Sequence, residues 1–189
     1  MVKYHYFETL EQLGELASSA VSLACGSASL KEQSNLSTLR RSCDRLVCEL
    51  EDALFSDFLP PLERDNIAAC AHSLSRVVEQ ASELFCHGLH SPIGTKQNEE
   101  GQICVRLATL LCESVALLPH IRRPDETPDV QGFRKLLGDG RNAHSSMLAK
   151  LHSGVLPRSA AQGIILTGRL RCELSHAFDE LVEIMLNNI

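Results

Sequence analysis

Apolar residues recur at every third or fourth position through most of this chain, and this spacing constrains its fold more than any other feature. The spacing matches the 3.6-residue turn of an α-helix and places the apolar side chains on one helix face. Six such stripes can be followed, over residues 7–24, 36–54, 67–85, 103–118, 133–151 and 164–185. No stretch sustains the alternation that a half-buried β-strand requires. The sequence therefore predicts an all-α fold of six long helices.

Residues that start or stop helices separate the stripes. Gly26 is expected to end the first helix, and Ser29 with Glu32 has the spacing of a capping box at the start of the second. Pro60–Pro61 ends the second helix because proline cannot continue a helix interior. Thr127–Pro128 is expected to start the fifth helix, as an N-cap followed by a first-turn proline. Such short connections make successive helices antiparallel neighbours.

A polar stretch with Gly88, Pro92 and Gly94 lies near the middle of the chain. It predicts a linker over residues 89–97, which separates an N-terminal three-helix half, residues 1–88, from a C-terminal three-helix half, residues 98–189. The two halves are expected to form one compact domain.

Composition and charge exclude several classes of function. Hydrophobic residues make up 44% and charged residues 22%, which are ordinary values for a globular protein. The formal net charge of −6 argues against nucleic-acid binding, and the pairs Arg40–Arg41 and Arg122–Arg123 are too short to form a basic surface. No apolar stretch approaches the roughly 18 residues of a membrane span, and the N-terminus lacks the apolar run of a signal peptide. We therefore expect a cytoplasmic protein.

The eight cysteines are spread along the chain without a C-x-x-C pair. In a chain without an export signal, they are expected to be reduced and mostly buried.

Three glycines, Gly132, Gly138 and Gly140, interrupt the fifth stripe. Each costs about 1 kcal/mol relative to alanine in a helix interior, so we expect close packing or a kink there. The run from Asp139 to Asn142 might instead suggest a phosphate-binding loop. That alternative is disfavoured because no strand precedes it and the lysine–hydroxyl pair of such loops is missing.

Two short motifs combine cysteine and histidine, which can bind metal ions or act in catalysis. The motifs Cys86-His87-x-x-His90 and Cys70-x-His72 contain soft metal ligands, but no second cluster completes a four-ligand site. Nothing singles out one Cys–His couple for nucleophilic catalysis, so we expect no enzyme and assign no catalytic residue. Several acidic residues are expected to lie on the solvated surface, and a contribution to a partner-binding face is the less favoured alternative: Glu11, Glu15, Glu32, Glu99–Glu100 and Asp125–Glu126.

The most specific run in the sequence extends from Cys48 to Ile67. It resembles the junction between the second and third helices of PhoU-like phosphate transport regulators, in the branch often encoded beside low-affinity inorganic phosphate transporters. The opening Tyr6-Phe7-x-x-Leu10 is also similar to the first helix of that family. The resemblance implies six antiparallel helices in two side-by-side three-helix bundles. The positions of the junction that fit the family pattern are Phe58, Pro61, Glu63, Arg64, Asp65 and Ile67.

Many members of this family hold metal clusters through (Glu/Asp)-x-x-x-Asp pairs on four helices. Residues i and i+4 lie on the same helix face, so two carboxylates can converge on one cation. The matching positions here are Arg40 and Asp44, Ser75 and Glu79, Leu137 and Arg141, and Gly168 and Cys172. Only the acids Asp44 and Glu79 remain in this pattern, so the resemblance implies that the metal clusters are lost and that no cofactor is bound. Arg40 is expected to pair with Asp44 across one helical turn.

The resemblance implies an accessory protein that modulates phosphate uptake by contact with a transporter or a signalling protein. It implies no nucleic-acid partner and at most a peripheral association with the membrane. A homo-oligomer is compatible with the apolar residues Ile121 and Val155 near helix ends. Two alternatives stay open: a metal-binding bundle in which Asp44, Glu79 and other acids rebuild a carboxylate site, and a small-molecule pocket between the two halves.

Overall fold

The computed structural model describes residues 4–26, 29–57, 59–90, 99–121 and 127–188. Six α-helices lie in these residues, and none of the described residues is in a strand. They are α1 Tyr6–Cys25, α2 Leu30–Ser56, α3 Arg64–His90, α4 Glu99–Val115, α5 Val130–His152 and α6 Ala161–Asn187. Two short 3₁₀ turns, η2 Leu118–His120 and η3 Arg158–Ala160, follow α4 and precede α6. The prediction of an all-α chain of six long helices is confirmed.

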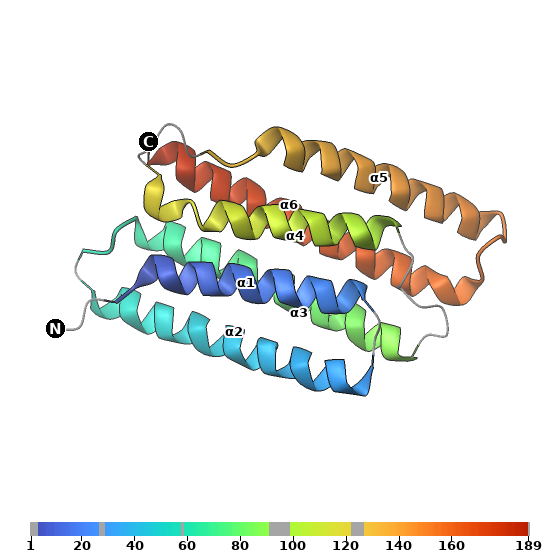
Figure 1. Cartoon of the computed structure of the whole chain (residues 1–189), viewed down its shortest axis with the longest axis horizontal. Coiled ribbons are helices and arrows are strands. Elements are labelled where there is room, and N and C mark those ends of the chain that lie inside the picture. Colours follow the sequence, from blue (N-terminus) through green and yellow to red (C-terminus); the bar gives the residue numbers. More distant parts are fainter. Residues whose placement is uncertain (1–3, 27–28, 58, 91–98, 122–126, 189) are drawn as a thin grey trace.

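The helices form two three-helix bundles that lie side by side, with α1–α3 in one and α4–α6 in the other (Figure 1). Helix α3 packs against α6, and α1 packs against both α3 and α4. These four helices form the centre of the molecule, while α2 and α5 lie on opposite outer sides. This is the arrangement that the family resemblance implies.

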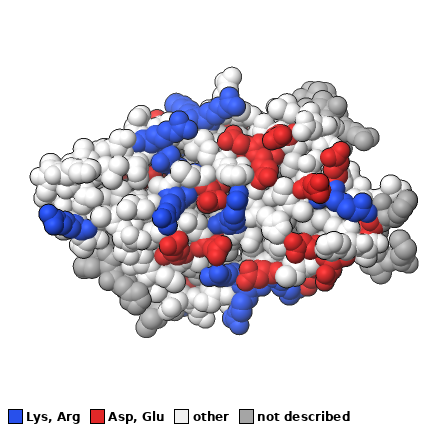
Figure 2. Space-filling model, turned by 180° about the vertical axis from the view of Figure 1, so that it is seen from behind, with Lys and Arg blue, Asp and Glu red and all other residues white. Residues whose placement is uncertain are grey.

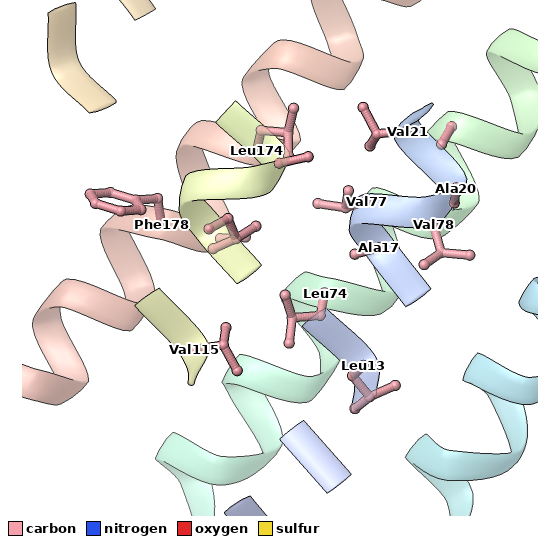
Figure 3. Packing of buried hydrophobic residues seen from close by; sticks show 14 of the residues in the cluster. Leu13, Ala17, Ala20, Val21, Leu74, Val77, Val78, Val115, Leu174 and Phe178 are labelled. Carbon is pink, nitrogen blue, oxygen red and sulfur yellow. The ribbon is translucent and has the colours of Figure 1, made fainter. Parts of the chain in front are cut away.

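Buried side chains of both bundles meet in one continuous hydrophobic cluster. Leu13 of α1, Val77 of α3 and Leu174 of α6 belong to this cluster, and Figure 3 shows them along the space where these helices meet. In the C-terminal bundle, the rings of Phe133 and Phe178 stack with centroids 3.7 Å apart. Aliphatic side chains of both bundles meet at this centre (Figure 3). A hollow of about 270 Å³ lies at one end of the interface between the halves, lined among others by Phe7, Leu62 and Leu118, so the alternative of a small-molecule pocket between the halves stays open.

Two helix boundaries agree with the sequence signals and one does not. Gly26 caps α1, and the Ser29 hydroxyl accepts a hydrogen bond of 3.3 Å from the Glu32 N–H at the start of α2. The prediction of Thr127 as the N-cap of the fifth helix is wrong. That helix begins at Val130, and the Asp129 carboxylate accepts a 2.8 Å hydrogen bond from the Gly132 N–H. Aspartate is as good a capping residue as threonine, and it lies directly before the first helical turn.

The junction between α2 and α3, which carries the family resemblance, is held by Arg64. Its Nε donates to the Leu54 carbonyl over 2.9 Å, and its guanidinium also contacts the Asp57 carbonyl. The Tyr6 hydroxyl of α1 donates to the Asp57 carboxylate over 3.2 Å. Arg64 therefore satisfies carbonyls that the end of α2 leaves without a helical partner. Phe58, another position of the matching pattern, lies outside the described residues.

Helix α3 continues to His90, two residues into the predicted linker of residues 89–97. The rest of that linker lies outside the described residues, as do Arg122–Arg123 and Asp125–Glu126.

The expectation that no segment is apolar enough to span a membrane needs correction. The segment Glu99–His120, which contains α4 and η2, is long and apolar enough by length and composition. Half of its most apolar window is buried inside the bundle, where α4 packs against α1, α5 and α6. Packing on three neighbours explains the apolar composition, because the side of α4 that faces these helices is apolar, while Gln102, Arg106, Thr109 and Glu113 are exposed.

All eight cysteines are free, as expected. The expectation that most of them are buried is wrong, because only Cys43, Cys70 and Cys104 are. The others lie at the edges of the apolar stripes or on outward helix faces. Cys25 and Cys112 are half-buried, and Cys48, Cys86 and Cys172 are exposed.

Candidate functional site

The positions that the family resemblance assigns to metal ligands on α2 and α3 do face each other. Arg40 Nη2 of α2 lies 3.5 Å from Glu79 Oε1 of α3, so an ion pair spans the two helices. The expected pairing of Arg40 with Asp44 is wrong, because the guanidinium extends across to α3. Both partners are more than half exposed, so the pair adds at most about 1 kcal/mol to stability.

The remaining positions of this set give no cluster of acids. Ser75 hydrogen-bonds the thiol of Cys43, whose pKa is raised by burial. Among the described residues, no group of three or more His, Cys, Asp or Glu side chains is arranged to hold a metal ion.

The matching positions on α5 and α6 also lie opposite each other. They line two hollows along the seam between these helices, of about 480 Å³ and 440 Å³. The hollows adjoin each other, since both are lined by Arg171 and Cys172, and we call the two together the α5–α6 furrow. The first hollow is lined by Leu137, Arg141, Arg171, Cys172, Ser175, His176, Asp179, Glu180 and Glu183. The second is lined by Gln80, His144, Ile165, Gly168, Arg169, Arg171, Cys172 and Glu173.

A buried carboxylate lies behind this furrow. Glu100, in the first turn of α4, is fully buried. Its Oε1 accepts a hydrogen bond of 2.9 Å from Arg171 Nε of α6, and its Oε2 lies 2.9 Å from His144 Nδ1 of α5. A buried carboxylate is tolerated only when it is paired, and here each oxygen meets a different helix. The three residues tie α4, α5 and α6 together.

The prediction that Glu100 lies on the solvated surface is therefore wrong. Its neighbour Glu99 is exposed, as are Glu11 and Glu15, while Glu32 is half-buried. A helix turns by 100° per residue, so adjacent acids face different directions, and only tertiary packing decides which one is covered. Asp125–Glu126 lies outside the described residues.

Two glycines make room for the partners of Glu100. A Cβ atom added to Gly140 would lie 2.7 Å from Arg171 Cδ, and one added to Gly168 would lie 2.7 Å from His144 Cε1. The predicted close packing is confirmed at Gly140, whereas a Cβ at Gly138 would meet nothing within 4 Å. Helix α5 is continuous through residues 139–142, which confirms the helical interpretation over a phosphate-binding loop.

The glycines are the one signal by which sequence reasoning could have found this buried group. Gly140 marked a close approach on α5, but nothing in the sequence identified Arg171 as the neighbour. The pairing joins residues 71 positions apart, so it exists only in the folded chain.

The cysteine and histidine motifs do not converge on a metal or a nucleophile. Cys70 is buried, and burial raises the pKa of its thiol to about 12, so almost no thiolate forms near neutral pH. His72 lies on the surface instead, with its Nε2 3.0 Å from Glu51 Oε1. Cys86 is exposed, and the side chain of His90 lies outside the described residues.

Acidic and basic side chains are interspersed on the face shown in Figure 2. Among the described residues of that face, lysine and arginine do not merge into one broad area. This mixture agrees with the net charge of −6 and lacks the concentrated basic surface that phosphate-backbone contacts require.

Comparison with known proteins finds similarity at the level of the fold. No protein-family model matches this sequence, and no curated protein matches it either. Two solved structures from Shewanella oneidensis MR-1 do match. One is a PhoU-like protein with a TM-score of 0.71, 15% identity and coverage of 96% of this chain and 97% of that one. The other is a PhoU-like phosphate regulatory protein with a TM-score of 0.73, 15% identity and 97% coverage of both chains. The chain therefore has a PhoU-like fold along almost its entire length.

Proposed function

We propose that this chain, with its PhoU-like fold, is an accessory protein that regulates inorganic phosphate transport by contact with a transporter or a signalling protein. In this proposal it acts in the cytoplasm, peripheral to the membrane at most, and carries out no catalysis. A rigid bundle can regulate by binding one conformation of its partner more tightly than another.

The observation that carries the proposal is the agreement between a whole-chain fold and a local motif. The two solved structures match 96% and 97% of this chain, and one of them is described as a phosphate regulatory protein. Independently, the α2–α3 junction with Pro61, Glu63, Arg64, Asp65 and Ile67 matches the family pattern.

Exposed apolar side chains at one end of the bundle support this proposal. Phe55 is 91% exposed and Leu59 is 79% exposed, both at the α2–α3 junction. Leu186, at the end of α6, is 67% exposed and lies at the same end of the molecule (Figure 1). Large exposed apolar side chains that lie close together, as Phe55 and Leu59 do at the junction, are typical of protein-contact surfaces. We call Phe55 and Leu59 the junction face.

Deletion of the gene should change phosphate uptake or phosphate-starvation signalling in the organism that encodes this chain. Reintroduction of the wild-type chain should restore the normal response, whereas a chain with Phe55→Ser and Leu59→Ser should restore it poorly. Radioactive phosphate uptake and a starvation-response reporter measure both effects.

The matched control is Val155→Ser, which removes an apolar side chain that is 71% exposed after α5, away from the junction face. It should restore the response like the wild type. Uptake and signalling that are wholly unchanged in the deletion strain would refute the proposed function, and full restoration by the Phe55/Leu59 variant would exclude the junction face.

We further propose that the family metal sites are lost, since Arg40 holds Glu79 and since Arg141 stands at a family ligand position on α5. A cation at either position opposes a polyvalent metal ion by like-charge repulsion. Elemental analysis of the purified protein should find no iron, zinc, nickel, manganese or calcium above background. A stoichiometric metal would instead support the alternative of a carboxylate site rebuilt around Asp44 and Glu79.

A further inference from the structure

We propose that the α5–α6 furrow binds a small oxyanion, such as inorganic phosphate or sulfate, through Arg171 and Arg141. The inference rests on the geometry of these side chains and does not depend on the proposed regulatory function.

Arg171 is the central observation. Its side chain is only 11% exposed, and its Nε is engaged by Glu100. Its terminal nitrogens Nη1 and Nη2 form no hydrogen bond with another described residue. Neither is a buried atom that lacks a partner, so both are accessible to solvent. Arg171 lines both hollows of the furrow. The guanidinium is thus held rigidly at one edge by Glu100 and offers its other N–H groups to the furrow. A planar fork of this kind matches the oxygens of phosphate and carboxylate groups.

Two further arginines add positive charge around this point. Arg141 follows Gly140, whose missing Cβ lets α5 approach the Arg171 side chain, and it lines the first hollow. Arg169 lines the second hollow. Neither Arg141 nor Arg169 forms an ion pair with another described residue, so both charges are available for a ligand.

The acids of the furrow restrict where an anion can lie. Asp179, Glu180 and Glu183 line the far end of the first hollow and would repel an anion there. Glu173, in the second hollow, is engaged by Arg76 over 3.3 Å. The favourable position is therefore the part of the first hollow beside Arg141 and Arg171, where it meets the second hollow at Arg171 and the exposed Cys172.

The hydrogen-bond donors at this position indicate the class of ligand. Two guanidinium groups and the Ser175 hydroxyl can donate several hydrogen bonds to one tetrahedral anion. This site occupies the α5–α6 positions at which the family pattern would place metal-binding carboxylates. In our proposal, an oxyanion binds there in place of a metal cation.

Binding is tested by titration calorimetry on the full chain, with inorganic phosphate and sulfate as probes and with chloride at equal ionic strength as the reference. Phosphate or sulfate should bind, and Arg141→Gln should weaken the affinity by about tenfold, the usual effect of one lost charge-assisted hydrogen bond. Arg141 is exposed, so this variant should fold normally. Arg41→Gln, at an exposed arginine on α2, is the charge-matched control and should bind like the wild type.

The position of the anion is tested by the labelling rate of exposed thiols, measured by mass spectrometry. Saturating phosphate should slow the labelling of Cys172 and leave the labelling of Cys48, which is exposed on α2, unchanged. Two results would overturn the proposal. One is no binding of either anion up to about 10 mM, tenfold above a dissociation constant of about 1 mM. The other is binding that neither Arg141→Gln weakens nor Cys172 labelling reports. A response to phosphate but not to sulfate would identify a site selective for phosphate.

Discussion

Replacement of Arg171 by methionine is expected to lower the free energy of unfolding by about 3 kcal/mol. The substitution preserves most of the apolar stem but removes the guanidinium that contacts Glu100 Oε1. Glu100 is fully buried, so the loss leaves a carboxylate in the core without its arginine partner. Breaking a buried ion pair on one side costs more than the pair itself contributes, because the remaining charge stays desolvated. Urea unfolding, monitored by circular dichroism, measures the change in the free energy of unfolding.

The control for this prediction is Arg169→Met, two residues away on α6. Arg169 is exposed and forms no ion pair with another described residue, so its replacement should change stability by less than about 0.5 kcal/mol. The double variant Glu100→Gln with Arg171→Met should recover part of the loss, because the buried charge is then removed. Equal stability of Arg171→Met and Arg169→Met would show that Glu100 does not depend on this partner.

Substitution of alanine at two neighbouring glycines of α5 should change stability in opposite directions. Alanine favours a helix over glycine by about 1 kcal/mol, so Gly138→Ala, which meets nothing within 4 Å, should stabilise the protein by up to that amount. At Gly140, the new methyl group would lie 2.7 Å from Arg171 Cδ and 3.3 Å from Ile103 Cγ2. The aliphatic part of the Arg171 side chain cannot simply move away, because its Nε is hydrogen-bonded to Glu100.

Gly140→Ala is therefore expected to destabilise the protein by about 2 kcal/mol, the usual range for overpacking in a core. Thermal and urea unfolding of both variants, measured side by side, give the sign directly. The pair separates close packing from helix propensity, because both sites lie in the same helix two residues apart. A stabilised Gly140→Ala variant would mean that α5 and α6 are packed less closely than the structure shows.

The local sequence predicts the helices well and the buried polar group badly, for one physical reason. Helix formation follows from the spacing of apolar residues within one segment, so stripes such as 67–85 identify α3 without knowledge of its neighbours. Helix ends are decided over a single turn, where several residues can serve as a cap. For this reason Ser29 was predicted correctly, while Thr127 was preferred over the actual cap, Asp129.

Burial of polar residues depends on which helices meet. Glu99 and Glu100 look alike in the sequence, yet only Glu100 faces α5 and α6. Similarly, Arg40 could reach Asp44 on its own helix or Glu79 on the next, and the approach of α3 favoured Glu79. Cysteines show the same limit, because an exposed thiol and a buried one have the same local signature.

The sequence by itself determined the six helices, their breaks at glycine and proline, and a family resemblance at the α2–α3 junction, since all of these depend on residues within a few turns of one another. Only the tertiary structure decided that Glu100, His144 and Arg171 meet behind the α5–α6 furrow. Their contacts join residues 44 and 71 positions apart, and such contacts arise only when helix packing brings distant faces together.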